Sequence, residues 1–247
     1  MNSDKPSHIS EEEWALRVQL AHCYHLVDFF GWTETIFNHI SARLPGREHA
    51  YLVNPFGLNY TEVTPANLLK VDLEGNKVEP SPYDANPAGF ALHSAIHGAR
   101  EDIHCVIHTH TNPVSAVAQK KAGFSHDNFY GAQLYGRVGY HAFEGITLFA
   151  EEKARMLASL GDKHILVLRN HGVAVGEMEE LLKTNDPVLL SFVEALLAEA
   201  GIDHFVADRN MSIMEGSIGV LPRRVLVPRA DLETARALLR DAEIDIP

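Results

Sequence analysis

The sequence predicts an α/β fold, a three-layer sandwich with a central, largely antiparallel β-sheet flanked by helices. Three observations carry this prediction. A helical pattern opens the chain, short apolar runs separated by turn residues follow it, and later apolar runs alternate with helical segments. With 46% hydrophobic and 22% charged residues over 247 positions and no visible linker, residues 1–247 are expected to form a single domain.

The first half of the chain supplies the opening helix and the first strands. Ser10 and Glu13 have the spacing of a capping box, and apolar residues recur at helical intervals from there to Gly31. Short apolar runs at 51–53 and 68–73 indicate strands joined by tight turns. Residues 81–89 have loop composition, and a helix is expected over 90–100.

The second half adds further strands and helices. β-Branched residues over 103–110 indicate a strand, and a helix is expected over 113–121. Apolar runs at 165–168 and 173–175 indicate two more strands, separated by Arg169-Asn170-His171-Gly172. A long helix is expected over 179–200.

Charge and cysteine content exclude several classes of protein. The net charge of −12, without a dense run of Lys or Arg, argues against nucleic acid as a partner. Neither a signal peptide nor a run of about 18 apolar residues is visible, so no membrane association and a cytoplasmic location are expected. Two cysteines, Cys23 and Cys105, fit a reducing compartment.

Histidine carries the chemical signal. If residues 103–110 form a strand, its period of two places His108 and His110 on one face, where they can share an ion, and Cys105 on the other. His171 lies where an apolar strand meets a glycine and is the candidate third ligand. Three imidazoles with an open fourth position suit Zn2+, and similar sites also accept Fe2+, Mn2+ or Co2+.

A second histidine pair is open to three interpretations. His93 and His97 are four residues apart on the expected helix over 90–100. They could be metal ligands, hydrogen-bond donors that orient the ligands, or a polar helix face.

Several motifs together resemble one known family. The similarity lies in the motifs CVIHTH and LRNHGVAVG, the 61-residue step from His110 to His171 and the segment LVNPFGLNYTEVTPANLLKVDLEGN. On these features the chain is similar to the class II aldolase/adducin family over about residues 10–205, with 206–247 as a C-terminal extension. The resemblance implies a divalent ion on the three histidines that polarises a substrate carbonyl. It also implies a homotetramer with active sites at subunit interfaces, where Tyr130 falls near the position of a proton-donating tyrosine from the neighbouring subunit.

Two departures from the family pattern alter the expected substrate. Sugar-phosphate aldolases carry Ser-Ser-Glu nineteen residues before the first metal histidine, where this chain has Pro87-Ala88-Gly89. The Gly-Asn phosphate loop is replaced around Asn38 and His39. These changes remove phosphate-binding hydroxyls and a proton-accepting carboxylate. The space beside Gly89 is expected to admit a substrate carboxylate, and Asn38, His39, Gly57, Ala88 and Gly89 are the candidate substrate contacts.

The pattern as a whole favours a metal-dependent lyase. Retro-aldol cleavage or decarboxylation of a small, non-phosphorylated oxygenated or aromatic acid is expected, with His93, His39 or Tyr130 as proton carriers. Two alternatives remain: an iron-dependent oxygenase on the same scaffold, and a non-enzymatic, adducin-like interaction module.

Overall fold

The computed structural model divides the chain into two compact units. It describes residues 5–44, 49–101, 103–132, 134–145, 150–176, 179–202, 204–207, 222–228 and 231–246. The first unit comprises Met1–Arg100 and His104–Gly176, and the second comprises Glu101–Ile103 and Glu177–Pro247. That the two units act as one class II aldolase/adducin-like domain over 1–247 stays a prediction.

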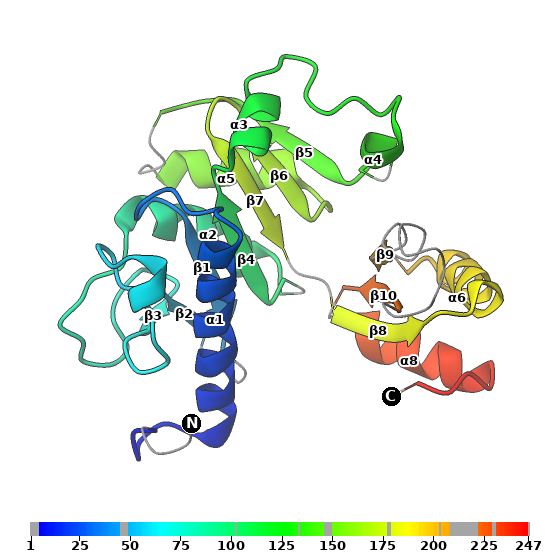
Figure 1. The fold of residues 1–247 in the computed structure, drawn as a ribbon, viewed down its shortest axis with the longest axis horizontal. Coiled ribbons are helices and arrows are strands. Elements are labelled where there is room, and N and C mark those ends of the chain that lie inside the picture. The colour runs from blue at the N-terminus through cyan, green and yellow to red at the C-terminus, as the bar shows by residue number, and fades with distance from the viewer. Residues whose placement is uncertain are drawn as a thin grey trace. The chain divides into compact units, whose positions relative to one another are not determined.

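A seven-stranded sheet forms the centre of the first unit (Figure 1). Its strand order is β3-β2-β1-β4-β7-β6-β5, and every pair is antiparallel except β5 and β6. The predicted α/β fold with a largely antiparallel sheet is confirmed. The strands are β1 (His39–Arg43), β2 (Ala50–Val53), β3 (Leu69–Asp72), β4 (Cys105–Thr109), β5 (Val138–His141), β6 (Ile165–Leu168) and β7 (Gly172–Gly176).

Helices cover both faces of this sheet. The side chain of Ser10 accepts a hydrogen bond from the Glu13 backbone N–H, and α1 (Glu11–Phe29) begins there as predicted. On the same face as α1 lies α3 (Asn112–Ala118), while α2 (Pro87–Ala99) and α5 (Ala150–Leu160) cover the other. The first unit therefore has three layers.

Strand alternation builds a core on each side of the sheet. On β2, Leu52 packs with Tyr24 of α1, whereas Tyr51 and Val53 point the other way and pack with Phe90 of α2. The same alternation places Cys105 in the α1 core, on the face opposite His108. The prediction that Cys105 is a core residue is confirmed. Two short helices, η1 (Tyr60–Glu62) and α4 (Phe129–Ala132), complete the first unit.

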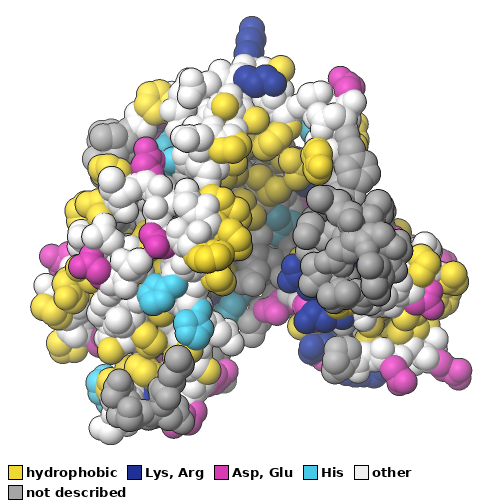
Figure 2. All heavy atoms as spheres, viewed as in Figure 1, with side chains coloured by type: hydrophobic (Ala, Val, Ile, Leu, Met, Phe, Trp, Pro, Cys, Tyr) yellow, Lys and Arg dark blue, Asp and Glu magenta, His cyan; other side chains and the backbone are white. Residues whose placement is uncertain are grey.

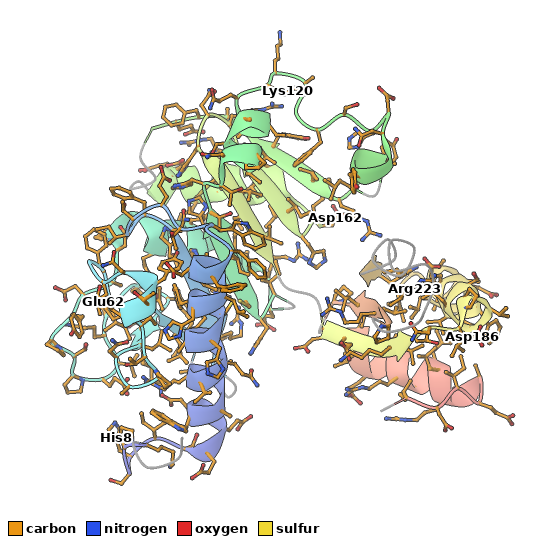
Figure 3. All side chains as sticks on the ribbon, viewed as in Figure 1. His8, Glu62, Lys120, Asp162, Asp186 and Arg223 are labelled. Carbon is orange, nitrogen blue, oxygen red and sulfur yellow. The ribbon has the colours of Figure 1, made fainter. Side chains whose placement is uncertain are left out.

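The second unit corrects one expected element. Residues 179–200 are not one helix: β8 (Glu179–Thr184) comes first, and α6 (Pro187–Glu199) begins only after Asp186 caps it (Figure 3). The side chain of Asp186 accepts hydrogen bonds from the first-turn backbone, and Pro187 fits the first helical position. Pairing of β8 with β10 overrides the helix-forming residues of Glu-Glu-Leu-Leu-Lys.

A small sheet and two helices make up this unit. Its strand order is β8-β10-β9, with β9 (Phe205–Ala207) and β10 (Arg223–Val227), and α8 (Leu232–Asp241) packs beside α6. Leu182, Val193, Val225 and Leu239 belong to its buried core. Within the described ranges of the chain, no helix is long and apolar enough to cross a membrane.

Candidate metal centre

Three histidines converge at one end of strands β4, β6 and β7. His108 lies on β4, His110 follows the end of that strand, and His171 lies in the turn between β6 and β7. One ring nitrogen from each falls within 4.8 Å of the others, and the Nε2 atoms of His108 and His110 are 2.7 Å apart. The structure thus brings together the three residues that the sequence singled out.

The local backbone explains how His171 reaches the other two. Asn170 adopts a left-handed conformation, with φ at 55°, which asparagine tolerates better than most residues. Gly172 permits close approach, because an added Cβ would lie 2.5 Å from both the His110 ring and the Thr109 carbonyl oxygen. The Asn170-His171-Gly172 turn is therefore fitted to present one imidazole beside His110.

Hydrogen bonds fix which nitrogens carry protons. The Nδ1 of His108 lies 3.0 Å from the Val173 carbonyl oxygen, which can only accept, so this nitrogen is the donor. The Nδ1 of His110 lies 2.5 Å from a carboxylate oxygen of Glu34 and donates likewise. In the neutral rings both Nε2 atoms then hold lone pairs that face each other at 2.7 Å. A shared cation relieves that repulsion, so these residues fit a metal ion.

Burial keeps the imidazoles in the form that binds metal. Burial, with the neighbouring histidines, holds the pKa of His108 well below its ordinary value. Burial, then the neighbouring His110, lowers the pKa of His171 to about 4. Both rings are therefore neutral at pH 7, with a free lone pair for a cation. His108 is buried, whereas His110 and His171 are partly exposed, so a ligand would reach the trio from their side.

Glu34 is a residue that the sequence analysis missed. Its carboxylate orients His110, although 76 positions separate the two residues. It lies in the loop between α1 and β1, beside Thr35, whose φ of 47° is unusual for threonine. Nothing in the spacing of a lone glutamate signals this role. The carboxylate–histidine pair is the arrangement that commonly supports metal-binding imidazoles.

Asn38 contacts the backbone of the site. It is fully buried, its Oδ1 accepts from the His110 backbone N–H at 3.1 Å, and its Nδ2 donates to the Trp32 carbonyl at 2.7 Å. Both ends of its amide are thus hydrogen-bonded to backbone, one to the end of β4 and the other to the loop that contains Glu34. That Asn38 also contacts substrate stays a prediction.

His39 and His93 belong to a buried chain of polar side chains. The Nδ1 of His39 lies 2.8 Å from the Nε2 of His93, whose Nδ1 lies 2.5 Å from Ser41 Oγ. Ser41 Oγ in turn lies 2.8 Å from the Nε2 of His97. His39 pairs directly with His108 across β1 and β4, and their rings stack with centroids 4.8 Å apart. Of the three interpretations of His93 and His97, hydrogen bonding behind the trio fits this geometry.

The space beside Gly89 is filled. A Cβ added to Gly89 would lie 2.4 Å from the Nε2 of His39, so the imidazole occupies the place of the missing side chain. The expectation that this position admits a substrate carboxylate is therefore wrong, because tertiary packing brings in a ring from β1.

Three further candidates lie apart from this chain of contacts. Ala88 lies in the first turn of α2, and its side chain is outside the described residues. Gly57, with φ at 94°, lies in an exposed turn after β2. Tyr130 lies on α4 and is 72% exposed. The roles expected for all three stay predictions.

Comparison with known families identifies the class of protein. Residues 18–179 match the family model described as "Class II Aldolase and Adducin N-terminal domain". That match covers most of the first unit and includes all three histidines. The chain belongs to the class II aldolase and adducin family. Residues 178–243 match a second model, described as "Putative prokaryotic signal transducing protein", which coincides with most of the second unit.

Two curated relatives illustrate the range of the family. The chain is 49% identical over 66% of its length to a "Putative aldolase class 2 protein" of Caulobacter vibrioides, and covers 64% of that protein. It is 44% identical over 68% of its length to alpha-adducin of Rattus norvegicus, and covers 23% of it. The chain thus spans less than two thirds of the length of these relatives.

Solved structures share the fold. An aldolase II superfamily protein from Pseudomonas syringae superposes with a TM-score of 0.66 and 35% identity, covering 96% of this chain and 95% of the other. An L-fuculose 1-phosphate aldolase from Glaciozyma antarctica gives a TM-score of 0.59 at 22% identity, with coverage of 97% and 94%. At that identity the second comparison supports the fold alone.

Proposed function

We propose that this chain is a metal-dependent lyase acting on a small, non-phosphorylated oxygenated or aromatic acid, by retro-aldol cleavage or decarboxylation. The observation that carries the proposal is the approach of the Nε2 atoms of His108 and His110 to 2.7 Å, with a ring nitrogen of His171 beside them. Packing alone gives no reason to turn imidazole lone pairs toward one another. Zn2+ suits three imidazoles best, with Fe2+, Mn2+ and Co2+ as alternatives.

Each part of the site has a defined task under this proposal. His108, His110 and His171 would hold the ion, and Glu34 and the Val173 carbonyl orient two of the rings. The ion supplies Lewis acidity toward a substrate carbonyl or carboxylate. Gly89 provides no carboxylate for proton transfer, so another residue must move the proton. We assign this task to Tyr130 or His93 and expect the substrate on the side of the partly exposed His110 and His171.

An exposed aromatic surface supports assembly of several copies. Five large apolar side chains around the end of α1 are each between 49% and 79% exposed: Leu26, Phe29, Phe30, Trp32 and Phe37. Phe30 stacks on Trp32 with ring centroids 5.0 Å apart. Hydrophobic side chains also reach the visible face of the first unit (Figure 2). A surface of this kind is typical of an interface, and we propose a homotetramer with active sites between subunits, at about four times 27.4 kDa in solution.

The lyase proposal is tested with metal-loaded protein and a panel of small hydroxy and aromatic acids, with release of carbon dioxide or aldehyde as the readout. Turnover is expected in the wild type and lost in His108→Ala. The matched control is His141→Gln, a buried histidine on β5. Equal turnover by His108→Ala and wild type would overturn the proposal. A requirement for dioxygen would favour the oxygenase instead.

Subunit sharing is tested by complementation. Tyr130→Phe and His108→Ala are each expected to be inactive as homotetramers. If Tyr130 serves the site of a neighbouring subunit, co-refolded mixtures contain some intact sites and regain part of the activity. Mixtures as inactive as their parents would contradict the shared site.

The similarity to alpha-adducin keeps a second candidate in view, a non-enzymatic interaction module. This function predicts an assembled protein that turns over no acid in the panel. Inactive protein without bound metal would favour the module over the lyase.

A further inference from the structure

The imidazole of His39 lies directly against Gly89. A Cβ added there would lie 2.4 Å from Nε2, 2.5 Å from Cδ2 and 2.8 Å from Cε1 of His39. Such distances are far below van der Waals contact, so even alanine requires the imidazole to move. Gly89 also lies in the first turn of α2, and glycine is the poorest helix former after proline. The helix therefore has a poor helix former at the position whose missing side chain would collide with this ring.

The His39 ring is buried and held by His93 and His108, so it has little freedom to move away. Its Nδ1 hydrogen bonds to His93, which is itself bound to Ser41. One face of the ring stacks on His108, with centroids 4.8 Å apart and planes inclined by 27°. The residue is 95% buried. A side chain at position 89 would therefore push against a fixed ring that touches the metal trio.

We propose that His39 is a positioning residue of the metal site, whose imidazole occupies the space of a residue-89 side chain and holds the His108 ring at the angle of the trio. The inference rests on the proposed metal function. His39 and Gly89 form a coupled pair. The imidazole fits in its place only if residue 89 is glycine, and the imidazole in turn fills the space that glycine would otherwise leave empty.

This pairing also limits where substrate can bind. The cavity shared by His39, Ser41, Gly89, Phe90 and His93 has room of about 10 Å³, enough for about one water molecule. A substrate carboxylate does not fit there. The acid must therefore approach the trio from its partly exposed side, away from Gly89.

Thermal unfolding of metal-free protein tests the coupling. Gly89→Ala is expected to lower the Tm of the wild type by about 5 °C or more, because the buried ring must move. His39→Asn keeps a polar atom near the place of Nδ1 and removes the outer part of the ring. In that background Gly89→Ala should leave the Tm unchanged or raise it by about 2–4 °C, as alanine favours the helix.

Two outcomes of this cycle decide the packing claim. If Gly89→Ala no longer lowers the Tm, or raises it, in the His39→Asn background, the coupling of His39 and Gly89 is supported. An equal loss of Tm in the wild type and in His39→Asn overturns the coupling. His39→Ala replaces His39→Asn if the latter is too unstable to measure. His39→Gln, which retains a polar atom near the place of Nε2, should leave Gly89→Ala damaging.

Cobalt binding tests the positioning role without an activity assay. Co2+ absorption in the visible range reports the geometry of its ligands. His39→Asn is expected to shift the wild-type band and weaken Co2+ binding about tenfold, as loss of residues that support metal ligands commonly does. The control His141→Gln should match the wild type.

A wild-type spectrum and affinity in His39→Asn would overturn the positioning role. If the wild type itself binds no Co2+, the proposed metal function fails. The unfolding cycle of the metal-free protein still decides separately whether His39 and Gly89 are coupled.

Discussion

Replacement of Glu34 by alanine should weaken metal binding while leaving all three candidate ligands in place. The Glu34 carboxylate accepts from His110 Nδ1 at 2.5 Å and so fixes both the tautomer and the orientation of this ring. Loss of such a partner commonly lowers metal affinity about 10–100-fold. The Glu34 side chain is 53% exposed, and water can take its place in part. We therefore expect the lower end of this range, about tenfold, or about 1.4 kcal/mol of binding free energy.

The assay is a Zn2+ titration of metal-free protein in competition with a chromophoric chelator. Glu34→Gln, which keeps an acceptor oxygen, should retain more affinity than Glu34→Ala. Glu74→Ala removes an exposed carboxylate from the turn after β3 and is the control. Wild-type affinity in Glu34→Ala would refute the argument that this carboxylate supports His110.

Three further predictions concern stability. Arg17→Met should cost about 3 kcal/mol and lower the Tm by about 10 °C in calorimetry. The reason is that this fully buried guanidinium binds two carboxylates and a backbone carbonyl. An unchanged Tm would contradict this prediction. Asn38→Leu leaves two partly buried backbone groups, the N–H of His110 and the carbonyl of Trp32, without their side-chain partner, and should cost about 1–3 kcal/mol in urea unfolding. A residue that only contacted substrate would leave unfolding unchanged. Metal-free protein should lose stability as the pH falls from about 6.5 toward 4, since His108 and His171 have lowered pKa values when folded and the unfolded chain takes up more protons in that window; a flat Tm between pH 7 and 5 would contradict this.

The pair of His108 and His110 could be predicted from sequence because its signal is local, and the family resemblance supported His171 as the third ligand. Two histidines two residues apart in a β-branched run share a face in any strand, and the turn containing His171 supplies the third. The helix that begins near Ser10 was equally predictable from its cap. Neighbouring residues determine the geometry of the His108–His110 pair and of the helix cap, whereas His171 joins the pair because β7 pairs with β4.

The environment of the trio was not predictable, because distant segments provide it. Glu34 reaches His110 from a loop 76 positions away, and nothing in its neighbours marks it. From the sequence, the missing side chain at Gly89 suggests open space beside this residue, but His39 of β1 fills that space. β8 was mistaken for helix because its strand character comes from pairing with β10, about forty residues later.

Metal content is the most direct test of the central claim. Protein expressed in medium with several divalent ions and then dialysed can be measured by plasma mass spectrometry, beside His108→Ala, His171→Ala and the control His141→Gln. The account predicts about one ion per chain in the wild type and the control, and almost none in the other two variants. A wild type that remains metal-free, or His108→Ala protein that retains a full equivalent, would contradict it.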